Sequence, residues 1–309
     1  MRKKVSLKEI SQKCGVSSAL VSSVLSGRKS ANRCSRETSE KIIACAKESG
    51  YTPNILAQAI ATGKSPIILF SLCENETWEK GADFYLNDLI LAGSKRFAEE
   101  GLYVLYMSYR TVEEQFEQIQ KSVRSGMVSG VVTNLLNPKG SKPLYDYMLE
   151  CQYPAVFLGF PDSDKVVSVG VDNQPVDAFL SEYAKKKGFR RGIQVSEGPE
   201  DRKFIVHPER VPFELSLLDD PGNLFFAAGF LNYTKILKKM PGIDKTRLIL
   251  LEDTRFYTGG LRSILIPSAQ PSVIEQTCRI LSAWCREGEA PAVRTHIIKR
   301  SMKEVEIYE

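Results

Sequence analysis

The positively charged side chains of this chain are concentrated in its first 64 residues. Twelve Lys or Arg residues stand there against four Glu, a net charge of +8, whereas the remaining 245 residues carry a net charge of −3. Clustered cations bind the phosphate backbone of nucleic acids, because each contact releases a condensed counterion. The alternative is a cationic surface that serves only solubility. The order of the residues within this region favours nucleic-acid binding.

Catalytic and metal-binding side chains are scarce. The chain has two histidines, His207 and His296, and lacks the GxSxG, HExxH, phosphate-loop and GxGxxG motifs. Seven cysteines are scattered without paired metal-ligand spacing, and their odd number argues against a complete disulfide framework. We therefore expect no catalytic residues, no metal and no cofactor, and an enzyme that uses a crevice of the body remains only a minor alternative.

Apolar residues are too dispersed for a membrane protein. No apolar run approaches the roughly 18 residues of a spanning helix, and the first residues lack a signal-peptide core. The 43% hydrophobic and 26% charged content fits one or two ordinary cores. We expect a cytoplasmic protein with no membrane partner.

Three helices are predicted in the cationic region. Ser6 and Glu9 have the spacing of a capping box, in which each side chain bonds the other residue's backbone N–H. Ile10 and Cys14 follow at helical spacing, and Gly15 permits a tight turn. A first helix followed by a turn is therefore expected here.

A second helix is predicted over residues 17–25, with Ser17 as its cap. Its spacing directs four apolar residues inward: Leu20, Val21, Val24 and Leu25. The same spacing directs four small residues outward: Ser18, Ala19, Ser22 and Ser23. Small outward residues allow a helix to enter the DNA major groove deeply.

A third helix is predicted to start at Ser35 and to end at Gly50. Its Ile42, Ile43 and Ala46 are expected to close a three-helix core. Together the three helices form a head of about 50 residues with the order of a helix-turn-helix domain.

These residues resemble the heads of the LacI/GalR (lactose-repressor-like) family of transcription regulators. The resemblance rests on Val5-Ser6-Leu7-Lys8-Glu9-Ile10, Gly15-Val16-Ser17, Val21-Ser22, Leu25-Ser26-Gly27 and Gly50-Tyr51-Thr52-Pro53-Asn54. It continues into Ala57-Gln58-Ala59-Ile60 and Gly63-Lys64-Ser65, where that family carries a hinge helix that folds on DNA. The resemblance implies a homodimeric DNA-binding regulator, and more specifically a repressor, that binds a roughly palindromic operator.

The hinge also resembles the family in carrying an apolar wedge. Ile60 falls where the family inserts a leucine into the minor groove, a step that kinks the DNA. The alternative for Ile60 is ordinary packing in a linker helix. Two positions depart from the family, since Ser23 and Gln58 stand where it commonly has arginine.

The loop over residues 27–34 is about three residues longer than in the family and contains Arg28, Lys29 and Arg33. We expect these cations to supply phosphate contacts that the helices lack. The complete set of predicted DNA contacts is Ser6, Leu7, Ser17, Ser18, Ala19, Ser22, Ser23, Arg28, Lys29, Arg33, Asn54, Ala57, Gln58 and Ile60.

The rest of the chain predicts an α/β fold with doubly wound parallel sheets. Short apolar runs at 67–72, 103–109, 130–133, 155–159 and 166–171 alternate with amphipathic segments at 84–101, 113–125 and 143–151. This part resembles the two-lobed, periplasmic-binding-protein-like body of the same family. The predicted organisation is a head over 1–52, a hinge helix and linker over 53–65, and a sensor and dimerisation body over 66–309.

Val171-Asp172-Asn173 and Arg300-Ser301 carry part of the body's resemblance. We expect Asp172-Asn173 to cap the following helix, and contact with a ligand is the alternative. The family's effector site is altered. The segment between Val195 and Leu224 is shorter than in the family, and Gly229-Phe230 stands where the family has an Asn-Asp pair.

The candidate effector contacts are Phe84, Arg202, Phe230, Glu252 and Asp253. For the two acids, capping or an ion pair with Arg255 is the alternative. The predicted crevice is therefore a degenerate sugar pocket that senses a more apolar molecule or none. The main rival function is a small-molecule sensor whose head binds DNA without sequence specificity.

Overall fold

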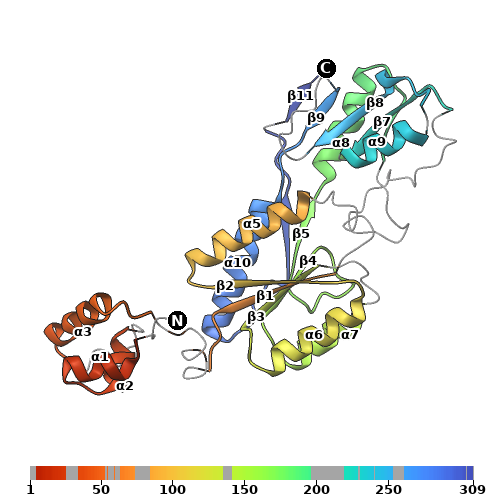
Figure 1. Ribbon diagram of the computed structural model, residues 1–309. Helices are drawn as coiled ribbons and strands as arrows, with labels where there is room; N and C mark the ends of the chain where they lie inside the picture. Colours follow the sequence, from red (N-terminus) through yellow and green to blue (C-terminus); the bar gives the residue numbers. More distant parts are fainter. Residues whose placement is uncertain are drawn as a thin grey trace. The chain divides into compact units, whose positions relative to one another are not determined.

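The computed structural model describes residues 5–25, 34–52, 54, 59, 63–73, 84–134, 141–195, 219–228, 230–239, 241–252, 261–303 and 305–308. The chain divides into two compact units, Met1–Ser65 and Pro66–Glu309, which are coloured red to orange and orange to blue in Figure 1. The boundary at Ser65 falls where the predicted linker ends. Each unit is described separately below.

The first unit is a three-helix head. Its helices are α1 (Leu7–Cys14), α2 (Ser18–Leu25) and α3 (Arg36–Glu48). Their buried core is Ile10, Cys14, Val21, Val24, Ile42 and Ala46. The three helices fall where the sequence predicts them, because the caps Ser6, Ser17 and Ser35 each accept a hydrogen bond from the first helical turn.

The second unit begins with a six-stranded parallel sheet in the order β10-β5-β4-β3-β1-β2. Its strands are β1 (Ile67–Cys73), β2 (Tyr103–Tyr109), β3 (Gly130–Asn134), β4 (Ala155–Leu158), β5 (Ser168–Asp172) and β10 (Thr295–Lys299). The five predicted strands are confirmed to within about two residues. The near-continuous burial of β1, β3 and β4 is typical of a sheet covered on both faces.

Helices cover both faces of this sheet (Figure 1). One core joins it to α5 (Phe84–Glu99) and α10 (Gln270–Glu287), and another to α6 (Val112–Arg124) and α7 (Lys142–Glu150). The contact of α5 with α10 includes an ion pair, in which Arg96 Nε lies 2.6 Å from a Glu275 carboxylate oxygen. The three helices predicted in this region are also confirmed.

A second, five-stranded sheet completes the unit in the order β11-β9-β8-β7-β6. Its strands are β6 (Arg191–Val195), β7 (Asn223–Ala228), β8 (Leu248–Glu252), β9 (Ser263–Leu265) and β11 (Glu306–Tyr308). Helices α8 (Gln174–Lys186) and α9 (Phe230–Lys239) pack on it through two separate hydrophobic cores. The strands β6 to β9 are parallel and β11 is antiparallel, so the expected doubly wound α/β body is confirmed.

Arg300 joins the three chain segments that pass between the two sheets. It directly follows β10, and its guanidinium donates to the carbonyls of Pro267 and Ile266, which follow β9, at 3.1 and 3.2 Å. It also donates to Asn173 Oδ1, which follows β5, at 3.4 Å. One side chain therefore connects all three crossings.

Candidate nucleic-acid interface

The start of α1 is fixed by the capping box that the sequence predicts. The Ser6 N–H donates to the Glu9 carboxylate at 2.7 Å, and the Glu9 N–H donates to Ser6 Oγ at 3.2 Å. Ser6 stays exposed while Leu7 is half-buried against the core. Gly15 ends the helix at φ 72°, a left-handed conformation that suits glycine.

The N-terminus of α2 presents small, uncharged side chains to solvent. Ser17 Oγ accepts from the Leu20 N–H at 3.2 Å, and Ser18 Oγ donates to Ser11 Oγ at 3.0 Å, which ties α2 to α1. Ser17, Ser18 and Ala19 are exposed, and Ser22 is half-buried. Hydroxyl groups bond base edges or phosphates, and an alanine methyl packs on a thymine methyl, so this surface suits major-groove contact.

Two expectations for the head are wrong. Ser23 is 8% exposed rather than outward-facing, because it follows Leu20 by three residues and so shares its inward face of the helix. Ile43 is 52% exposed rather than part of the core, because Ile42 takes the inward position of α3 with Ala46 four residues later. Ser23 is therefore poorly placed to contact a base edge in this conformation.

Lysine side chains surround the head. Lys8, Lys13, Lys41 and Lys47 are all exposed. Lys13 Nζ donates to Ser49 Oγ at 3.0 Å and thereby joins α1 to the end of α3. These lysines contribute to the positive charge of the first 64 residues, but their positions in the sequence did not identify them as candidate phosphate contacts. Their exposure in a helical frame adds them to the candidate interface.

The core of the head contains two neighbouring thiols. Burial raises the pKa of the Cys14 thiol above its ordinary value, and the adjacent Cys45 thiol raises it further. Cys14 is 6% exposed at the end of α1, so its side chain acts as a small apolar core residue.

Several predicted DNA contacts lie outside the described residues: Arg28, Lys29, Arg33, Ala57, Gln58 and Ile60. Asn54 is described and is exposed. The structure therefore gathers Ser6, Ser17, Ser18 and Ala19 as exposed candidates on a folded head. The loop and hinge contacts stay predictions.

The candidate effector residues occupy the carboxyl ends of strands. Phe84 is the first residue of α5, which follows β1, and Phe230 is the first residue of α9, which follows β7. Glu252 is the last residue of β8, the neighbour of β7. Ligands of doubly wound sheets bind at such ends. Arg202, Asp253 and most of the segment predicted to be shortened lie outside the described residues.

Asp172, rather than Asn173, bonds the start of α8. Its Oδ1 accepts from the Gln174 N–H at 2.9 Å, whereas Asn173 makes no capping bond with its side chain. The helix-start role expected for this pair is thus confirmed for Asp172 alone.

Within the described ranges, no three His, Cys, Asp or Glu residues gather in a way that would hold a metal ion. None of the helices that the structure describes combines the length and apolar character needed to cross a bilayer.

Residues 6–54 match the family described as "Bacterial regulatory proteins, lacI family", and this match spans all three helices of the head. Over these residues the chain is similar to the lacI family of regulators. It is 27% identical over 195 residues to the HTH-type transcriptional regulator MalR of Staphylococcus xylosus, covering 62% of this chain and 56% of that relative. It is 25% identical over 255 residues to MalR of Streptococcus pneumoniae, covering 78% of this chain and 74% of that relative.

The fold of the chain is similar to that of a solved regulator. The lac repressor dimer bound to operator and the anti-inducer ONPF matches with a TM-score of 0.72 at 16% identity, covering 99% of this chain and 98% of that chain. The similarity confirms the predicted architecture, a helix-turn-helix head followed by a two-sheet body. The named relatives are transcription regulators, which agrees with the prediction that the chain is not an enzyme.

Proposed function

We propose that this chain is a DNA-binding transcription regulator that represses by binding a roughly palindromic operator as a homodimer. The observation that carries the proposal is the head, where a family match over residues 6–54 coincides with a capped three-helix core and an exposed, uncharged N-terminus of α2. We assign residues 1–52 to this head, 53–65 to a hinge helix and linker, and 66–309 to a sensor and dimerisation body.

In this mechanism α2 contacts the base edges and the lysines contact the phosphates. The helix has no charged side chain, so its base contacts come from hydroxyl and methyl groups. Affinity then depends on phosphate neutralisation by Lys8, Lys13 and the loop cations, and binding weakens steeply as salt is raised. Ile60 of each protomer would wedge the centre of the operator.

Dimerisation through α5 is supported by an exposed apolar side chain. Leu91 on this helix is 70% exposed, which is unusual for a leucine on a helix that also contributes to the core. A partner helix packed on Leu91 would remove it from water. The lac repressor, whose fold is similar, is a dimer when bound to its operator.

The body is proposed to sense a small molecule at the carboxyl ends of β1, β7 and β8. The altered residues of this region, with Phe230 in place of an Asn-Asp pair, favour a ligand more apolar than a simple sugar, or the loss of sensing. A thermal-shift screen tests this directly, since strong stabilisation by a simple sugar would contradict it.

The decisive experiment is selection of bound sequences from a random duplex library by the full-length protein. A roughly palindromic enriched motif is expected. A library that stays random, with binding at low salt only, would support the alternative of a sensor with a nonspecific head.

A matched pair of variants tests the role of α2 on the selected motif. Ala19→Asp places a negative charge against the DNA, whereas Ala44→Asp makes the same change at an exposed position of α3. Ala19→Asp should weaken binding about a hundredfold in a dimer, from about 1.4 kcal/mol per protomer, with no loss of stability because an acid suits a helix N-terminus. Equal effects of the two variants would refute major-groove reading by α2.

A further inference from the structure

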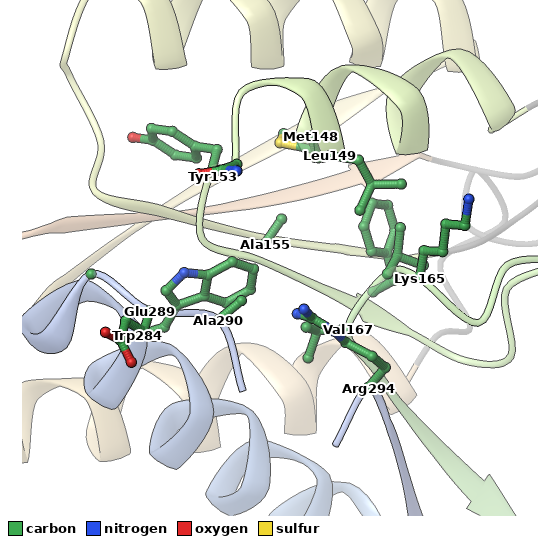
Figure 2. Close-up of a pocket in the computed structure, with 14 residues that line it drawn as sticks. Met148, Leu149, Tyr153, Ala155, Lys165, Val167, Trp284, Glu289, Ala290 and Arg294 are labelled. Atoms are coloured by element: carbon green, nitrogen blue, oxygen red, sulfur yellow. The ribbon is translucent and has the colours of Figure 1, made fainter. Parts of the chain in front are cut away.

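A pocket lies at one end of the strands of the six-stranded sheet, and it is distinct from the candidate effector crevice. Its volume is about 450 Å³. It lies between the end of α7, the start of β4, the segment before β5, and the segment that leads from α10 to β10 (Figure 2). All these pieces belong to one sheet and its covering helices.

The pocket lies at the amino ends of the parallel strands. Its lining residues Ala155, Val167 and Arg294 are the first residue of β4 and the residues just before β5 and β10. The candidate effector residues Phe84, Phe230 and Glu252 instead follow the carboxyl ends of their strands. The pocket is therefore separate from the candidate effector residues, because it lies at the amino ends of strands of the six-stranded sheet.

Part of the pocket wall is formed by buried apolar side chains. Phe157, Val167 and Trp284 contribute buried side chains, with Trp284 8% exposed. Tyr153 Oη donates to the Val128 carbonyl, which fixes the tyrosine ring at the rim. Cys285, next to Trp284, donates through Sγ to the Ser129 carbonyl at 3.3 Å and anchors the end of α10. A cavity of this size that combines apolar walls with a few polar groups is the usual setting of a small-molecule site.

Cations dominate the polar part of the lining. Figure 2 shows the Arg294 guanidinium extending into the pocket towards Trp284, with Lys165 on the neighbouring rim and Glu289 on the far side. No salt bridge between described residues engages Arg294 or Lys165. An arginine fork in this position is free to bind a carboxylate with two parallel hydrogen bonds.

We propose that this pocket binds a small organic carboxylate that carries an aromatic ring or a short aliphatic chain. Arg294 holds the carboxylate, and the apolar part packs on Trp284, Phe157 and Val167. Lys165 adds a second positive charge at the rim. This site goes beyond the proposed function and does not depend on it, because binding is measurable without DNA.

The test uses isothermal titration calorimetry on the full-length protein with benzoate and hexanoate as probes. Benzamide, the neutral counterpart of benzoate, and inorganic phosphate, which lacks an apolar part, serve as comparison ligands. At least one carboxylate should bind saturably and at least tenfold more tightly than benzamide and phosphate. Location is checked by the emission of Trp284 in a Trp78→Phe background, because these are the two tryptophans of the chain.

Two variants and one control decide the assignment. Arg294→Gln replaces the guanidinium with a shorter, uncharged amide side chain, and it should weaken carboxylate binding at least tenfold. Ala290→Trp fills the pocket from an exposed position and should abolish binding. Lys121→Gln removes an exposed charge on α6 outside the pocket and should change nothing. Absence of saturable binding by both carboxylates, or equal binding by the wild type and Arg294→Gln, would overturn the proposal.

Discussion

The adjacent isoleucines of α3 offer a test of how the head is stabilised. Ile42 is 0% exposed and Ile43 is 52% exposed, yet both lie in the same helix and both can be replaced by alanine. Ile42→Ala removes three buried carbons, worth about 2.4 kcal/mol at about 0.8 kcal/mol per group, and leaves a cavity in a core of six side chains. We expect a loss of about 2–4 kcal/mol in the stability of the head.

Ile43→Ala should cost far less. Roughly half of its burial is lost, about 1 kcal/mol, and part of that is offset because alanine favours the helix by up to about 0.5 kcal/mol. The predicted difference between the two variants is therefore about 2–3 kcal/mol. It corresponds to about 30-fold to 150-fold in the equilibrium constant for opening the head.

Native-state hydrogen exchange followed by mass spectrometry measures this difference in the full-length protein. Amides of α1, α2 and α3 should exchange about 30-fold to 150-fold faster in Ile42→Ala than in Ile43→Ala, while those of the body stay unchanged. Equal exchange in the two variants would refute the assignment of Ile42 to the core and the geometry of α3.

Three further predictions concern both units. Ser6→Ala removes the hydroxyl of the capping box and should destabilise α1 by about 1 kcal/mol, measured as faster exchange of its amides; unchanged exchange would contradict the box. The pKa of the Cys14 thiol is raised in the folded head, so its contribution to stability is fully present below about pH 9 and is lost as pH rises through the folded-state pKa. The loss occurs because the thiol of the unfolded chain ionises at a lower pH than that of the folded head. Denaturant titrations should show this loss of stability in the wild type and a flatter pH profile in Cys14→Ala. Gly93→Leu should destabilise the body by about 1–3 kcal/mol, because a Cβ at Gly93 would lie 2.6 Å from Tyr106 Oη, whereas Lys95→Leu on the exposed side of α5 should be nearly neutral in thermal unfolding.

The strands and caps of this chain were accessible from sequence because their signals are local. Runs such as the one at Tyr103–Tyr109 are bounded by turn residues, and Ser6 and Glu9 form a box over only four positions. The parallel alternation of strands and helices then restricts the body to a doubly wound fold.

The predictions for Ser23 and Ile43 were wrong because a helix of few turns repeats its apolar pattern too rarely to define which face is buried. The helix α2 has only eight residues, and its serines match either face, so Ser23 was placed outward although it is buried. In α3, two adjacent isoleucines cannot both face inward at 100° per residue, and sequence alone did not select Ile42 over Ile43.

The carboxylate pocket left no local signal at all. Tyr153, Trp284 and Arg294 meet only because α10, which begins at Gln270, returns to a sheet whose preceding strand ends at Asp172. Such a site requires the tertiary arrangement, since no spacing in the chain brings its members together.

Arg300 has a mechanical consequence for the body. A relative rotation of the two sheets would twist all three chain segments that connect them. Arg300 lies on one of these segments, and its guanidinium donates hydrogen bonds to acceptors on the other two. Because the fork offers five donors in one plane, it can exchange one acceptor for another while remaining bonded. The three connecting segments held by Arg300 therefore act as a hinge that allows a small rotation of the two sheets and resists their separation.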